Sequence, residues 1–288
     1  MTRWIRVLGL AAAAVALHAS DGWAQADELS VYAAVVDKSD TPVTGLGIGD
    51  FIVREDGASR EVLRVSATNE PMHIALLVDT GAAIEPHQLD LRQALLSFFK
   101  AMAGKNDIAV IGTGERPTVI QDYTQNLALL EKSIGAIFPH TGSGTYLLEA
   151  LTDASAGLRR RKAQRPTIVI ISTQGTEFGE QHHDTVLDAL RESGVAVHSL
   201  VLTSRGALTR REDLEVEQTI DEGTRNTGGR RDNVLTSMAL GDRLQKLANE
   251  LNSQYRVTYA RTKSLLPPKT LEVTVKRPEL TVRARRWP

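Results

Sequence analysis

The segment of residues 72–83, with the sequence MHIALLVDTGAA, constrains the fold most, because it places an apolar run directly before a polar turn. Residues 74–78 carry no polar side chain, and the run ends at Asp79. An uninterrupted apolar run closed by a turn is typical of a strand buried on both faces, as in a parallel sheet covered by helices. Ligands of such sheets bind beyond the carboxyl ends of the strands. The loop that begins at Asp79 is therefore the first candidate for a functional site.

Helical and strand-like patterns alternate after this run. Residues 108–111, 168–171 and 195–202 are expected to be strands. Apolar spacing predicts helices over residues 89–102, 145–158, 185–192, 211–224 and 240–251, and a further helix with its N-cap at Thr124 and with Leu127, Leu130, Ile134 and Ile137. Strands separated by helices of this length indicate an α/β fold with a doubly wound, mainly parallel, Rossmann-like sheet.

Both flanks of this series have a period of two instead. Residues 27–70 alternate apolar and polar side chains on either side of Asp56-Gly57, a hairpin signal, and residues 254–288 alternate in the same way. Neither flank has enough strands to enclose a core alone. We therefore expect residues 27–70 and 254–288 to pack together as one small β-sandwich, with the α/β domain of residues 71–253 inserted between them.

The N-terminus has the pattern of a secretory signal peptide. Arg3 and Arg6 precede an apolar run over residues 7–17, and Ala24-Gln25-Ala26 has the small-x-small form of a cleavage site. We expect residues 1–26 to be removed after Ala26, with no membrane insertion afterwards and a periplasmic or secreted product. The chain has no cysteine and a formal net charge of −1, which argues against disulfide staples and against a nucleic-acid partner.

Three loops follow buried strands or precede helices in the predicted sheet, over residues 79–83, 142–145 and 173–176. Their candidate partner-binding residues are Asp79, Thr80, Gly81, Ala83, Ser143, Thr145, Gln174 and Thr176. The arrangement resembles the von Willebrand factor type A (VWA) domain over residues 71–253. That family has a metal-ion-dependent adhesion site, with an Asp-x-Ser-x-Ser loop, a Thr at a helix start and an Asp followed by Gly.

Further segments strengthen the resemblance. Residues 144–151, GTYLLEAL, are similar to the Gly-Thr-x-Leu-x-x-Ala-Leu segment of the family. Residues 50–57, 251–259 and 282–286 resemble flanking motifs of the bacterial exported "VWFA-related" proteins. The resemblance implies a protein-binding domain that uses the loops at the carboxyl edge of its sheet.

The metal-binding positions of the family are only partly retained. The family's two serines are Gly81 and Ala83 here, which have no side-chain oxygen, and Gln174 replaces its second aspartate. Magnesium requires oxygen ligands and carboxylate charge. The resemblance thus implies a degenerate metal site and no cofactor. If Mg²⁺ or Mn²⁺ binds weakly, Asp79 and Thr145 are its remaining ligands.

Most of these residues also have a structural interpretation. Asp79 can cap its own turn through backbone N–H groups, Thr145 can begin a helix, and Gln174 can contact a partner or bridge loops. His182 and His183 are adjacent and point apart on a helix, which favours a solvated helix start over a metal site. His140 and His198 are isolated and are expected to be structural.

Two basic runs have the same ambiguity. Residues 159–162 with Arg165 suit the negative end of a helix dipole, and a docking patch for an acidic partner is the alternative. Arg230 and Arg231 form a second, shorter run that carries the same two interpretations.

The combined pattern predicts a non-enzymatic exported module that binds a protein partner without metal. A cation-dependent adhesion receptor is the first alternative. An α/β enzyme and a structural assembly subunit are more distant ones. The chain contains no Gly-x-Ser-x-Gly elbow, and the Gly142-Ser143-Gly144-Thr145 loop lacks the lysine of a phosphate-binding loop.

Overall fold

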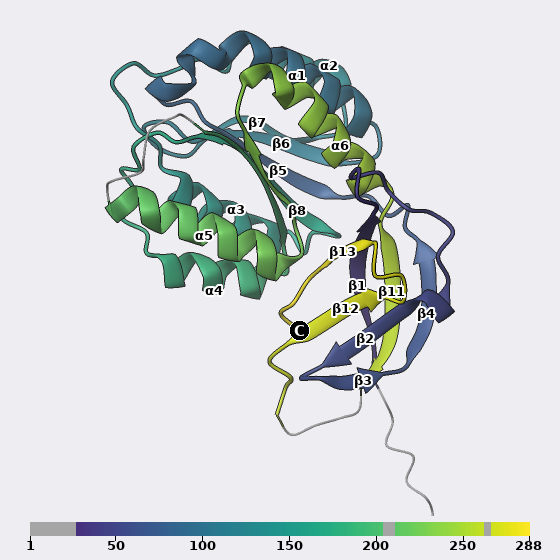
Figure 1. Cartoon of the computed structure of the whole chain (residues 1–288). Coiled ribbons are helices and arrows are strands. Elements are labelled where there is room, and N and C mark those ends of the chain that lie inside the picture. Colours follow the sequence, from purple (N-terminus) through teal and green to yellow (C-terminus); the bar gives the residue numbers. More distant parts are fainter. Residues whose placement is uncertain (1–26, 204–210, 262–265) are drawn as a thin grey trace, which may run out of the picture.

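The computed structural model describes residues 27–203, 211–261 and 266–288, which fold into two packed units (Figure 1). The larger unit is an α/β layer structure, and the smaller one is built from strands of both flanks. Short 3-10 turns at Ile48–Asp50, Ala82–His87 and Ser237–Ala239 (η1, η2 and η3) complete the connections.

The larger unit is organised around a six-stranded sheet in the order β10-β9-β8-β5-β6-β7. All neighbouring strands are parallel except β6 and β7. The six strands are β5 (His73–Val78), β6 (Asp107–Gly112), β7 (Thr118–Thr124), β8 (Pro166–Thr173), β9 (Ala196–Leu202) and β10 (Arg231–Val234). Strand β5 lies between β8 and β6, and its residues from Ile74 onward are buried, as the uninterrupted apolar run predicts.

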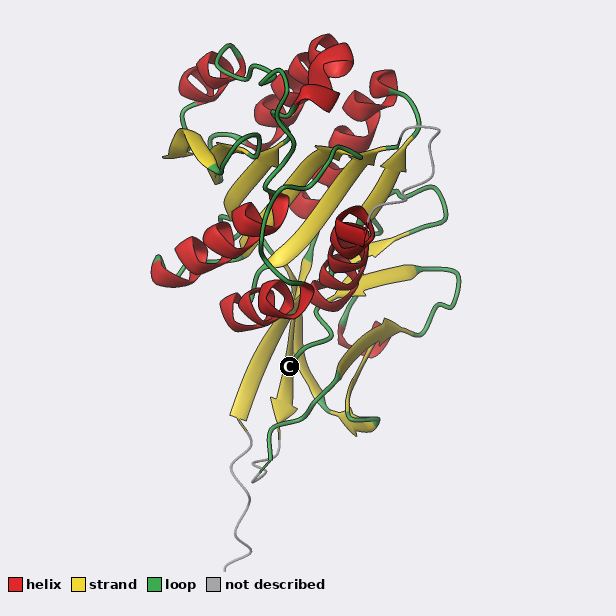
Figure 2. Cartoon of the chain, turned by 90° about the vertical axis from the view of Figure 1, so that its left-hand side faces the viewer, coloured by secondary structure: helices red, strands yellow, loops and turns green. Residues whose placement is uncertain are grey.

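Helices cover both faces of this sheet (Figures 1 and 2). One face carries α1 (Gln88–Met102), α2 (Leu127–Ile134) and α6 (Leu240–Asn252), and the other carries α3 (Leu147–Arg160), α4 (His183–Ser193) and α5 (Arg211–Thr227). Alternate residues of β5 enter the two resulting cores: Leu76 belongs to the core that contains Phe98 and Leu244, and Leu77 belongs to the core that contains Leu151. The predicted doubly wound, mainly parallel fold is confirmed.

The smaller unit is a β-sandwich. One sheet has the order β13-β1-β11-β4, from Thr281–Ala284, Asp27–Val36, Tyr255–Arg261 and Val62–Ala67, and the other has the order β12-β2-β3, from Leu271–Val275, Phe51–Glu55 and Ala58–Arg60. Val31 lies opposite Val257 in the antiparallel β1–β11 pair, and the two sheets share one apolar core. The hairpin between β2 and β3 turns at Asp56 and Gly57, whose φ angles of 47° and 80° suit a tight two-residue turn. The two flanks therefore join, as their shared period of two predicts.

Several local predictions are wrong. Strands β7 and β10 were not predicted, because β7 lies at the sheet edge with no residue fully buried and β10 has only four residues. Thr124 ends β7 rather than capping α2. The N-cap is Asn126, whose side chain accepts hydrogen bonds from the amides of Ala128 and Leu129. Helix α3 begins at Leu147, so Thr145 precedes it and is not its first residue.

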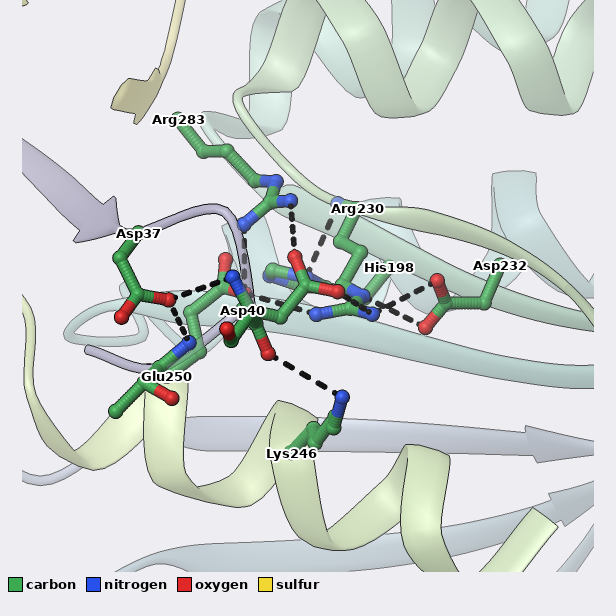
Figure 3. A network of polar contacts seen from close by, with 10 residues as sticks. Asp37, Asp40, His198, Arg230, Asp232, Lys246, Glu250 and Arg283 are labelled. Carbon is green, nitrogen blue, oxygen red and sulfur yellow. Dashed lines mark hydrogen bonds and ion pairs between the residues drawn. The ribbon is translucent and has the colours of Figure 1, made fainter. Parts of the chain in front are cut away.

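A buried polar network joins the two units (Figure 3). Arg230 pairs with Asp40 of the β1–β2 connection at 3.0 Å and with Asp232 at 2.6 Å. Arg283 of β13 reaches Asp40 at 3.2 Å and Glu250 of α6 at 2.9 Å. These contacts tie β1 and β13 of the sandwich to β10 and α6 of the α/β unit.

Arg165 makes a second connection between the units. Its guanidinium donates to the backbone oxygen of Glu70, to the backbone oxygen of Leu251 at 3.0 Å and to the side chain of Gln254 at 2.7 Å. The side chain is buried, so Arg165 is not part of an exposed docking patch. Arg230 is likewise buried, and Arg231 pairs with Glu217. The neighbouring basic residues Arg159 and Arg160 do lie in the last turn of α3, as predicted.

Across residues 27–203, 211–261 and 266–288, no helix is both long and apolar enough to span a bilayer. The predicted signal peptide lies outside the described residues.

Candidate functional site

The carboxyl edge of the sheet brings the three predicted loops together around Asp79. Asp79 is buried, with 1% of the residue exposed. Its Oδ1 accepts a hydrogen bond from the amide of Gly81 at 2.7 Å, and its Oδ2 accepts from the amide of Thr173 at 3.0 Å and from the Thr173 hydroxyl. Asp79 therefore closes its own turn and links it to the end of β8.

Thr80 joins the same loop to its other neighbours. Its Oγ1 accepts from the amide of Gly114 at 2.8 Å, and its backbone oxygen accepts from the amide of His140 at 2.8 Å. The Thr80 side chain is buried and so cannot contact a partner directly. It anchors the β6–β7 connection and the segment before α3.

Thr145 lies between two loops instead of starting a helix. Its amide donates to the Thr176 backbone oxygen at 2.8 Å, and its Oγ1 lies 3.0 Å from the Thr113 hydroxyl and 3.3 Å from the Thr113 backbone oxygen. It forms isolated bridges with Gly114 and Glu177. The Thr145 hydroxyl is thus engaged at the end of β6.

Gly81 and Ala83 allow the loops to approach closely. A Cβ added at Gly81 would lie 2.8 Å from the Gly144 backbone oxygen and 3.1 Å from Asp79 Oδ1. A Cβ added at Gly175 would lie 3.5 Å from the Ala83 Cβ. The space that a serine side chain would need at position 81 is therefore filled by the backbone of the neighbouring loop.

The three remaining predicted residues are half-buried at the outer side of these loops. Ser143 donates through its hydroxyl to the His140 backbone oxygen at 2.8 Å. Gln174 and Thr176 both have interaction partners within the protein. A cavity of only about 20 Å³ lies beside Gln174, between the loops and the first turns of α5. The structure thus brings all eight predicted residues to one edge.

Glu177 is a buried residue of this edge that was not predicted. It accepts hydrogen bonds from the amide of Leu147 at 3.1 Å and from the amide of Gly179 at 3.3 Å, and so caps the start of α3. Burial, reinforced by the nearby Glu149 carboxylate, raises the pKa of Glu177 to about 7. A signal was available in the sequence, since Glu177 follows a buried strand and precedes a helical segment at the same edge.

Exposed apolar side chains surround these loops, and we call them the apolar rim. Six of the ten exposed large apolar side chains in the described part of the chain belong to loops or first helical turns at this edge. They are Leu89, Phe138, Phe178, Leu214, Leu235 and Met238, each at least 50% exposed. Residues scattered singly need no explanation, whereas large contiguous apolar patches are typical of interaction surfaces. The sequence analysis did not predict the apolar rim, because the sequence does not indicate which apolar residues of a loop are exposed.

The histidines of the described ranges have structural or surface positions. His182 is exposed at the start of α4, and His183 lies 3.0 Å from the Thr219 hydroxyl and 3.3 Å from Glu222. His198 is fully buried, its Nδ1 accepts from the Arg230 amide at 3.2 Å, and burial lowers its pKa to about 3. Nowhere in the described ranges do three His, Cys, Asp or Glu side chains gather in a metal-binding geometry.

Comparison with known proteins identifies the α/β unit. Residues 74–176 match the family model of the von Willebrand factor type A domain. No curated protein sequence matches the chain.

Several solved structures share the fold. A von Willebrand factor type A protein from Catenulispora acidiphila has a TM-score of 0.52 and 11% identity, over 85% of this chain and 74% of that one. Proximal thread matrix protein 1 from the mussel byssus has a TM-score of 0.52 and 14% identity, over 69% of this chain and 50% of that one. The pilus adhesin SpaC from Lactobacillus rhamnosus GG has a TM-score of 0.51 and 12% identity, over 82% of this chain and 47% of that one.

Identities this low establish the fold alone, whereas the family model rests on the sequence of residues 74–176. That stretch includes β5, the three loops and β8, which form the edge described above. Residues 74–176 of the α/β unit therefore belong to a von Willebrand factor type A domain, and the unit as a whole has the fold of that family.

Proposed function

We propose that the chain is an exported, non-enzymatic module that binds a protein partner through the carboxyl edge of its VWA domain, without a bridging cation. The apolar rim is the observation that carries this proposal. It surrounds polar loops whose hydrogen-bonding groups are already paired with one another. A surface of this composition fits a protein with a complementary apolar patch.

The chemistry of the loops supports binding without metal. Both oxygens of Asp79 accept hydrogen bonds from protein donors, and the Thr145 hydroxyl is engaged with Thr113. Gly81 and Ala83 supply no side-chain oxygen. A divalent cation would have to displace several hydrogen bonds and would gain only one carboxylate. These residues do not fit the metal site of the family.

A cation-dependent receptor is the second candidate, and one comparison favours keeping it. Another structure of the mussel byssus protein is described as having zinc in its metal-ion-dependent adhesion site. That structure has 14% identity with this chain and a TM-score of 0.51, so its metal says nothing directly about Asp79. The two candidates differ in whether a chelator abolishes partner binding.

An enzyme is disfavoured by how the polar groups are used. The loops offer the carboxylates of Asp79 and Glu177, and both cap backbone amides. The Thr145 and Thr173 hydroxyls are engaged with Thr113 and Asp79 respectively. An activated nucleophile needs a base within hydrogen-bond reach. Thr173 and Asp79 form such a contact, but both oxygens of the buried Asp79 carboxylate also accept hydrogen bonds from backbone amides, which favours a structural role for the pair.

Site-specific photo-crosslinking tests the proposed surface. A photoreactive amino acid replaces Phe178 or Leu235 of the apolar rim, and the protein is irradiated in the cells that produce it. A discrete crosslinked protein is expected at both positions, with or without a chelator.

Ile48 provides the matched control, because it is 50% exposed but lies in η1 of the smaller sandwich unit. Crosslinking at Ile48 to the same partner with equal yield would contradict the proposed surface. Loss of the Phe178 crosslink on chelation, with recovery on adding Mg²⁺, would contradict the cation-free mode and support the second candidate.

A further inference from the structure

A cleft of about 870 Å³ lies at the opposite end of the VWA domain from the predicted loops. Strand β12 and the segment from β13 to the C-terminus form one wall, and Arg191 of α4 and Asn226 of α5 border it from the α/β unit. These two residues lie near the C-terminal ends of their helices, at the amino edge of the sheet. In Figure 1 the C-terminus lies beside β12, where the two units face each other.

Strand β12 presents a free edge to this cleft. It pairs with β2 on one side and ends its sheet on the other. The amide of Lys276 donates to the backbone oxygen of Asp50, and the backbone oxygen of Thr270 accepts from the amide of Asp56. The even-numbered residues of β12 therefore direct their N–H and C=O groups toward β2. Val273 therefore directs its N–H and C=O away from β2, because these directions alternate along a strand.

The chain already uses one position on this edge. The amide of Leu271 donates to the backbone oxygen of Arg286 at 2.7 Å, which is a bond of the kind an added strand would make. The C-terminal segment is held there by a second bond, from the Arg286 amide to the Asn226 oxygen at 2.9 Å. Beyond this contact, the outward groups of Val273 and the outward amide of Val275 face the cleft.

Positive charge dominates the walls of the cleft. Its cations are Arg191, Lys269, Arg277 and Arg286, and its one acidic side chain is Glu272. Glu272 lies 3.7 Å from Arg54, which offsets its charge. Arg191 stacks 4.9 Å from the centre of the Trp287 ring, and Arg286 forms no ion pair within the described part of the chain. Arg277 lies 3.7 Å from Asp50, so Arg191, Lys269 and Arg286 are the cations that remain for an anionic occupant, on both sides of the cleft.

Apolar side chains line the rest of the cleft. Leu280 and Val282 are half-buried on the sandwich side, next to the buried Val273. If a further strand paired with β12, the side chains on one of its faces would point toward these apolar residues, and those on its other face would point toward the cations.

We propose that the free edge of β12 binds an extended acidic segment of a partner protein by strand addition, with apolar and acidic residues alternating. Backbone hydrogen bonds to Val273 and Val275 supply affinity, and the cations select the charge. This second site is independent of the partner surface at the carboxyl edge. It would allow the protein to hold two partners at opposite ends of the VWA domain.

A peptide titration tests the site without knowledge of the natural partner. The probe is a fluorescent seven-residue peptide of alternating valine and glutamate, and its control replaces each glutamate with lysine. Fluorescence anisotropy with the mature chain is expected to show saturable binding of the acidic peptide and at least roughly tenfold weaker binding of the basic one. Equal affinity for both peptides, or no binding of the acidic one, would overturn the proposal.

Two variants of one residue isolate the backbone contribution. Val273→Pro removes an N–H that points away from β2, so the β12–β2 pairing keeps its hydrogen bonds, whereas Val273→Ala shortens the side chain and keeps that N–H. The proline variant is expected to lose peptide binding and the alanine variant to retain it. Equal binding by both folded variants would contradict strand addition.

A test on exposed side chains remains informative if Val273→Pro fails to fold. The double variant R191E/R286E is expected to weaken the acidic peptide by at least about tenfold and to strengthen the lysine peptide. The matched control K105E changes an exposed cation outside the cleft and is expected to leave both affinities unchanged. In hydrogen exchange, bound acidic peptide is expected to slow the amides of Val273 and Val275 specifically. Unchanged exchange at both amides would contradict the proposal.

Discussion

At the scale of the residue, the packing of the loops at the carboxyl edge depends on the absence of a side chain at Gly81 as well as on the hydrogen bonds of Asp79. Asp79 could be recognised from the sequence as a turn-forming carboxylate, and the structure shows it in that position. The close approach of Gly81 to Gly144 could not be predicted, because it depends on loops far apart in the chain. The ionisation of Glu177 was hidden for the same reason, since burial arises only in the fold.

Replacing Gly81 with serine is expected to destabilise the protein rather than create a magnesium site. The new Cβ would lie 2.8 Å from the Gly144 oxygen, and the loops would have to shift at a cost of about 1–3 kcal/mol. Thermal melts with and without Mg²⁺ measure this. Gly47→Ser is the control, because nothing lies within 4 Å of its added Cβ. A melting temperature of G81S that rises with Mg²⁺ would contradict the cation-free account.

Glu177 is expected to make stability depend on pH. Its folded-state pKa of about 7 lies above the ordinary value of 4.5, so its contribution is fully present below pH 4.5 and is lost as the pH rises through 7. Glu177→Gln mimics the protonated acid and should therefore keep this contribution at high pH. In the wild type, the free energy of unfolding that is lost by pH 8 is on the order of 3 kcal/mol. Urea unfolding at pH 4.5 and pH 8 measures it. Glu85→Gln, on an exposed side chain, is the control, and an identical pH profile of wild type and E177Q would refute the assignment.

At the scale of the element, most helices and buried strands could be predicted because their apolar patterns are long. Strand β5 and helix α1 follow the pattern within one or two residues of their expected bounds. Strands β7 and β10 gave no such signal, because an edge strand and a four-residue strand bury few side chains. The start of α2 was misplaced because Thr124 and Asn126 are both N-cap residue types only two positions apart.

The corrected cap has a measurable consequence. Asn126→Ala removes the acceptor for the amides of Ala128 and Leu129 and is expected to cost about 1 kcal/mol. Thr124→Ala loses one exposed hydrogen bond, from the amide of Asn126, and should cost clearly less. Urea unfolding of the two variants ranks the positions. A larger loss for T124A than for N126A would restore the prediction made from the sequence.

At the scale of the whole molecule, pairing of the two flanks could be predicted from their shared period, but their contact with the α/β unit could not. In the sequence, Arg165 and Arg230 belong to basic runs that suit a helix dipole or a docking patch, and in the structure both are buried where the two units meet. Their partners are distant in sequence, such as Asp40 for Arg230 and Leu251 for Arg165. Only the assembled fold reveals such ion pairs and hydrogen bonds.

Arg230→Ala is expected to lower stability by about 3–5 kcal/mol, because it removes the counter-charge of Asp232 and leaves Asp40 and Glu250 paired with Arg283 alone. Arg64→Ala breaks the exposed pair with Glu28 and should change stability by less than about 1 kcal/mol. Denaturant unfolding measures both. Equal stability of R230A and wild type would show that the network of Figure 3 does not hold the two units together.

The central claim is that the carboxyl edge of this VWA domain is complete without a cation, and calorimetric titration of Mg²⁺ and Mn²⁺ into the chelator-treated protein tests it most directly. We expect no heat of binding up to millimolar ion and no change in melting temperature, since a ligand specific for the folded state would raise it. Saturable heat together with a higher melting temperature, both abolished by Asp79→Asn, would contradict the account and identify a cation-dependent receptor.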